Sequence, residues 1–122
     1  MPVLLLATSL LLTFGSTHHW AADPPKSRVA KVEDPSLLTN FDPKPDRIKT
    51  AVASLLTTLT GKSTPTDAWK DLGINPGDTV AVKVTARGDP RTGTRREVAD
   101  AVAASLIAAG VKADQIDRKS VV

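Results

Sequence analysis

The segment 79–85 (TVAVKVT) constrains the fold of this chain more than any other stretch. Its valines at positions 80, 82 and 84 alternate with Ala81, Lys83 and Thr85, so one face is apolar and the other is more polar. This period of two, in β-branched residues, is typical of a half-buried β-strand. We therefore predict a strand over 79–85 that packs one face against a core.

A helical pattern follows this strand after a loop over 86–93. Thr94 and Glu97 have the spacing of a capping box, and Gly110 is placed to end the helix in a left-handed conformation. The residues expected on the inner face are Val98, Ala101, Val102, Ser105, Leu106 and Ala109. Val111 to Ile116 then leads toward a second strand, and the order strand, helix, strand implies a right-handed crossover with parallel pairing.

Two further helices are predicted before the valine-rich strand. Residues 46–60 carry an apolar stripe at helical spacing, with Asp46 as N-cap and Gly61 as the stop. The stripe is made of Ile48, Val52, Leu55, Leu56 and Leu59. A short helix follows, which Thr64 and Asp67 are expected to cap, and the turn 75–78 (NPGD) leads into the strand.

The segment 23–45, before the first predicted helix, is rich in proline. Five of the nine prolines lie within 23–45, and Ser27–Glu33 alternates enough to predict one short strand there. The expected class is therefore α/β, as a truncated β-α-α-β-α unit of a larger mixed or parallel sheet. We assign 23–45 to a proline-rich lead-in and 46–116 to a partial α/β domain.

The N-terminal segment reads as a targeting signal. Val3–Phe14 is predominantly apolar, and small residues at Ala21 and Ala22 precede Asp23 and two prolines. About 20 residues are needed to cross a bilayer, so this run favours a bacterial-type signal peptide over 1–22 and no stable membrane span after cleavage. The expected location is periplasmic or extracellular. An uncleaved anchor or a buried helix are the alternatives.

The last six residues, DRKSVV, have a second interpretation. A common sequencing adapter encodes this hexapeptide in one reading frame, and that frame then meets a stop codon. We therefore expect 117–122 to be a non-native tail, with the second strand of the crossover missing because the natural gene continues.

Composition excludes several kinds of chemistry. The chain has no cysteine, so disulfides, thiolate nucleophiles and cysteine-ligated metals are excluded within it. Both histidines, His18 and His19, lie in the predicted signal, which leaves no nucleophile–base pair in the mature chain. The sequence accordingly assigns no catalytic residue, metal, cofactor, reaction or oligomeric state. A net charge of +3 and arginines without interleaved aromatics argue against a nucleic-acid partner.

The loop over 86–96 has the composition of an anion-binding site. It joins the carboxyl end of the predicted strand to the N-terminus of the following helix. Open α/β sheets bind ligands at this place, and the helix dipole favours a phosphate or carboxylate there. The residues predicted to hold this small anionic ligand are Lys83, Arg91, Gly93, Thr94 and Arg95. The alternative is that Thr94 and Glu97 only cap the helix while the arginines form a solvated face.

The order of these elements resembles the N-terminal part of the domain of unknown function 362 family. The stretches that carry the resemblance are DAWK at 67–70, PGDTVAVKV at 76–84, GDPRTGTRREV at 88–98 and AAGV at 108–111, and it covers about residues 27–116. Lys83 stands at the family's lysine position, Thr85 replaces the usual asparagine, and Arg96 stands where a proline is common. The resemblance implies a largely uncharacterised family, some of whose members carry ferredoxin-type cysteines that this chain lacks.

Two functional hypotheses follow from the sequence. In the first, the chain is a fragment of an exported family member that binds an anion at 86–96, belongs to an enzyme subdomain and is not functional alone. In the second, it is a non-catalytic exported binding module. The residues of this chain do not decide whether the whole protein is an enzyme.

Overall fold

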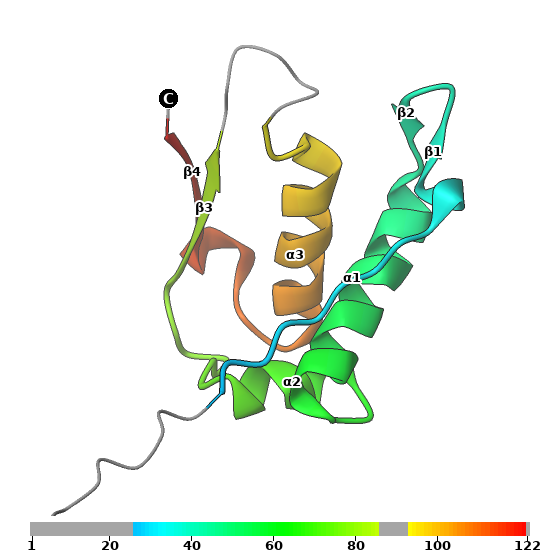
Figure 1. The fold of residues 1–122 in the computed structure, drawn as a ribbon. Coiled ribbons are helices and arrows are strands. Elements are labelled where there is room, and N and C mark those ends of the chain that lie inside the picture. The colour runs from blue at the N-terminus through cyan, green and yellow to red at the C-terminus, as the bar shows by residue number, and fades with distance from the viewer. Residues whose placement is uncertain (1–25, 86–92, 122) are drawn as a thin grey trace, which may run out of the picture.

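The computed structural model describes residues 26–85 and 93–121, and Figure 1 shows an α/β arrangement. Its elements in chain order are η1 (Pro35–Leu37), β1 (Leu38–Thr39), β2 (Asp42–Pro43), α1 (Pro45–Thr60), α2 (Pro65–Asp71), β3 (Val80–Thr85), α3 (Arg96–Ala108), η2 (Ala113–Gln115) and β4 (Ile116–Val121). The α/β class is thereby confirmed. The predicted signal peptide lies outside the described residues.

Strands β3 and β4 form a two-stranded parallel sheet, as the crossover predicted. The register pairs Val80 with Ile116 and Thr85 with Val121. The expectation that the second strand is missing is wrong, because residues 116–121 form it. The strand begins at Ile116, after Val111, which is buried at the end of α3 and donates its backbone N–H to Leu106 O (3.1 Å), and after η2.

Helix α3 lies between the sheet and α1 (Figure 1). Its buried residues are Ala99, Ala101, Ala103 and Leu106. The predicted inner face was therefore too narrow, because α3 packs on two sides. Ala99 and Ala103 are buried although the single stripe left them out, whereas Val98 remains 37% exposed.

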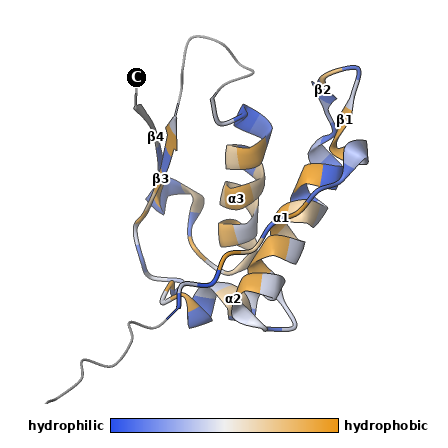
Figure 2. Ribbon diagram, viewed as in Figure 1, coloured by the Kyte–Doolittle hydropathy of each residue, from blue (hydrophilic) through white to orange (hydrophobic). Residues whose placement is uncertain are grey.

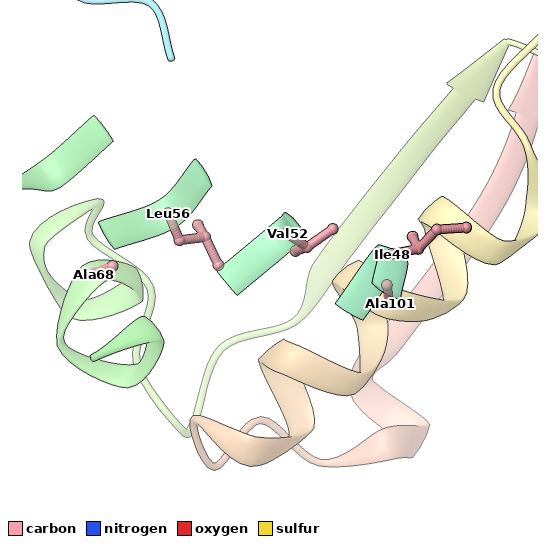
Figure 3. Close-up of a cluster of buried hydrophobic side chains, with 5 residues drawn as sticks. All are labelled: Ile48, Val52, Leu56, Ala68 and Ala101. Atoms are coloured by element: carbon pink, nitrogen blue, oxygen red, sulfur yellow. The ribbon is translucent and has the colours of Figure 1, made fainter. Parts of the chain in front are cut away.

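The core lies mainly between α1 and its neighbours. Figure 3 shows the cluster of Ile48, Val52, Leu56, Ala68 and Ala101, drawn from α1, α2 and α3. The i, i+4, i+8 spacing of the first three puts them on one face of α1, as predicted. Apolar segments of α1 and α3 face one another in Figure 2.

The ends of α1 and α2 show which local signals operate. Helix α1 starts at Pro45 with Lys44 as N-cap, so the prediction of Asp46 as N-cap is wrong: proline takes the first helical position and Asp46 lies in the first turn. Gly61 ends α1 at φ 72°, as predicted. In α2 the Thr64 hydroxyl accepts from the Asp67 N–H (3.1 Å) and donates to the Asp67 carboxylate (2.7 Å).

The strand predicted over Ser27–Glu33 is not formed. Residues 26–34 run extended across the helices without strand pairing (Figure 1). The Arg28 guanidinium donates to Leu59 O at the end of α1 (3.1 Å), while Ala30 and Val32 line the helical surface. Side-chain contacts with the helices thus replace the ladder that a strand would need.

Candidate functional site

The candidate site is the connection from β3 to α3. Because β3 and β4 are parallel, their carboxyl ends share one edge of the sheet, and the N-terminus of α3 lies near that edge (Figure 1). Ligands of open α/β sheets bind at such edges. Residues 86–92, which include Arg91, lie outside the described part of the chain.

Thr94 ties the start of α3 to the end of β3. Its backbone N–H donates to Thr85 O (2.8 Å), and its hydroxyl accepts from the Thr85 N–H (3.3 Å). The capping box predicted from Thr94 and Glu97 is therefore wrong, because the Thr94 hydroxyl is directed to the strand. The N-cap is Arg95, which makes no side-chain capping bond.

Arginines surround this end of α3. Arg95 is half-buried, and its guanidinium donates to Phe41 O (3.4 Å) on the loop between β1 and β2. Arg96 lies 3.6 Å from the carboxylate of Asp100, one turn along the helix. Arg118 of β4 also pairs with Asp100, so that carboxylate lies between a helical and a strand cation.

Lys83 lies on the other side of the sheet from α3. The valines of β3 are half-buried toward α3, whereas Ala81, Lys83 and Thr85 are exposed. The structure thus brings Gly93, Thr94 and Arg95 together at the start of α3 and directs the Lys83 side chain to the opposite face. Reaching one ligand from both faces would require the ligand to lie at the edge of the sheet.

Sequence reasoning did not assign Arg118 or Phe41 to this region. Arg118 was placed in a tail, and Phe41 is 54 positions from the arginine it contacts. No signal of local spacing could pair them. Among the described residues there is no group of three or more His, Cys, Asp or Glu that could hold a metal ion.

Comparison with protein-family models, curated proteins and solved structures finds no match to this chain. In the described part, no helix combines the length and apolar character that a bilayer crossing requires.

Proposed function

We propose that the β3–α3 connection, residues 86–96, binds a small anion such as phosphate or a carboxylate. The observation that carries the proposal is the start of α3, which has Arg95 as N-cap, no side-chain capping bond, and a position at the carboxyl edge of a parallel sheet. Helix N-termini favour anions through backbone N–H groups and the macrodipole, by up to ~1 kcal/mol at an exposed site.

The surrounding charge supports the same ligand class. One N–H group of the Arg95 guanidinium donates to Phe41 O, and its other N–H groups are available for bidentate contact with phosphate or carboxylate. Arg96 and Arg118 share Asp100, so these three side chains together carry one excess positive charge. Adding Arg95 raises this excess to two, and Glu97 in the first turn of α3 lowers it to one, so the proposed site is cationic.

The wider proposal is that this chain is a piece of an exported protein of the domain of unknown function 362 family and does not function alone. Parallel sheets are normally covered on both faces, yet the Ala81, Lys83 and Thr85 face of β3 is exposed. This supports a larger α/β protein in which a further layer covers that face. The apolar run before Phe14 supports export to the periplasm or beyond.

Thermal unfolding with inorganic phosphate tests the anion site. Phosphate should raise the Tm of the parent chain, and this rise should disappear when both Arg91 and Arg95 are replaced by Gln. Arg47→Gln is the matched control, because Arg47 is an exposed arginine on α1. A rise that is unchanged in the double variant would contradict the site.

Genomic DNA beyond the codon for Ile116 separates the two functional hypotheses. A longer reading frame that supplies acids, His or Cys near strand ends would support an enzyme subdomain. A native stop directly after an authentic DRKSVV would support the binding module and refute the non-native tail.

A further inference from the structure

The loop between β1 and β2 carries an unusual aromatic residue. The hairpin pairs Thr39 with Asp42 across a two-residue loop, Asn40 and Phe41, whose φ angles are 50° and 69°. Positive φ at both positions is typical of a type I′ turn, in which glycine usually takes the second place. A bulky residue there is a genuine outlier, and Phe41 is also 79% exposed.

The structure holds this ring away from the helices. The hairpin projects beyond the start of α1 (Figure 1), and the Arg95 guanidinium fixes the Phe41 carbonyl (3.4 Å). At the base of the hairpin the Lys44 N–H donates to Leu37 O (2.9 Å). The hairpin therefore holds the Phe41 ring in one position, although its positive φ and its exposure to solvent are both unfavourable in a single copy. Backbone strain of this kind is concentrated at binding sites.

The same chain has an apolar hollow formed by side chains of α1, α2, α3 and the extended segment before them. It lies between α1 and α3 beneath residues 26–34 and has a volume of about 270 Å³. Its lining consists of Ala30, Val52, Leu55, Leu56, Leu59, Trp69, Val98 and Val102. The indole N–H of Trp69 is already bonded to the Ser105 hydroxyl (3.0 Å), so the wall that Trp69 presents is apolar. Since an apolar cavity of about 150 Å³ binds benzene, this hollow admits a phenyl ring.

We propose that Phe41 of one copy inserts into this hollow of a second copy. Within one copy the Phe41 side chain is 79% exposed and is not among the residues that line the hollow, so the hollow is not filled by the ring of its own chain. Two copies related by a two-fold axis exchange rings reciprocally, and the contact closes as a dimer.

Sedimentation equilibrium of the full chain over about 10 to 200 μM tests the proposal. The parent should associate, and Phe41→Ser should weaken association at least about tenfold. Val29→Ser is the matched control, because Val29 is 86% exposed and lies on neither the hairpin nor the hollow. A monomeric parent, or Phe41→Ser associating as tightly as Val29→Ser, would overturn the proposal.

A mixing experiment tests the partner surface. Ala30→Phe should fill the hollow from its own chain and weaken self-association while leaving Phe41 in place. Mixing Ala30→Phe with Phe41→Ser should restore part of the association, since the mixed dimer can form one of the two ring–hollow contacts. Trp69 emission should shift to the blue in the mixture, with Trp69→Phe as the control for Trp20. A mixture that behaves as the sum of its components would overturn the proposal, as would Ala30→Phe associating like the parent.

Discussion

Replacing Gly110 by alanine tests how α3 is joined to β4. Gly110 has φ 99°, and a Cβ built there would lie 3.2 Å from Pro76 Cγ and 3.3 Å from Pro76 Cβ. The left-handed conformation costs about 1–2 kcal/mol for a residue with a Cβ. Pro76 lies in a turn closed by hydrogen bonds between Asn75 and Asp78, so yielding should cost about 1 kcal/mol more. We expect a loss of about 2–3 kcal/mol and a Tm lower by roughly 10 °C.

Urea unfolding followed by circular dichroism measures this loss, and two other glycines provide controls. Gly61 (φ 72°) and Gly73 (φ 86°) would place a Cβ in open space, so their alanine variants should show only the conformational cost, about 1–2 kcal/mol. A double-mutant cycle with Pro76→Ala, which removes Cγ and keeps Cβ, should recover the part of the cost that comes from the Cγ contact. If Gly110→Ala lowers the free energy of unfolding no more than Gly61→Ala does, the contact with Pro76 does not restrict which residue can follow α3.

Three further predictions follow from local contacts. Thr64→Ala removes the cap of α2 and should cost about 1 kcal/mol in urea unfolding; an unchanged midpoint would contradict it. Trp69→Phe and Ser105→Ala each break the same hydrogen bond, so each should cost about 1 kcal/mol and the double variant much less than their sum; full additivity would contradict coupling. The Ser36 hydroxyl, and then its N–H, donate to the Asp34 carboxylate and hold its pKa below 3.8. Because the pKa of Asp34 is lower in the folded than in the unfolded chain, its stabilisation of η1 is fully present above the pKa of the unfolded chain. This stabilisation is lost as the pH falls through the pKa of the folded chain. An NMR titration of the Ser36 amide should therefore have its midpoint below pH 3.8, and a midpoint above it would contradict the prediction.

The elements that could be predicted from the sequence are those specified by neighbouring residues. The stripe of α1, the Thr64 cap, and the glycines at 61 and 110 depend on residues within one or two turns. The valine alternation of β3 likewise needs only a buried face on one side. These signals are local, so the structure preserves them.

The elements that could not be predicted are those where two partners compete for the same groups. Residues 27–33 have strand-like alternation but contact helices, and the Thr94 hydroxyl bonds Thr85 although its spacing suits a capping box. At the candidate site, Gly93 to Arg95 follow from sequence order. The contact of Arg95 with Phe41 depends on the tertiary path of the chain.

The alanines at positions 99, 101 and 103 of α3 have a consequence for how this protein can change. All three are buried on a helix packed on two sides, so they set the spacing between the sheet and α1. Ala101 belongs to the cluster with α1, whereas Ala99 and Ala103 lie on another side of the helix, so a larger residue at any of them would push α3 away from the neighbour that it faces. Evolutionary drift in α3 should therefore be confined to its solvated positions, while the interior keeps small side chains even though larger ones would bury more apolar surface.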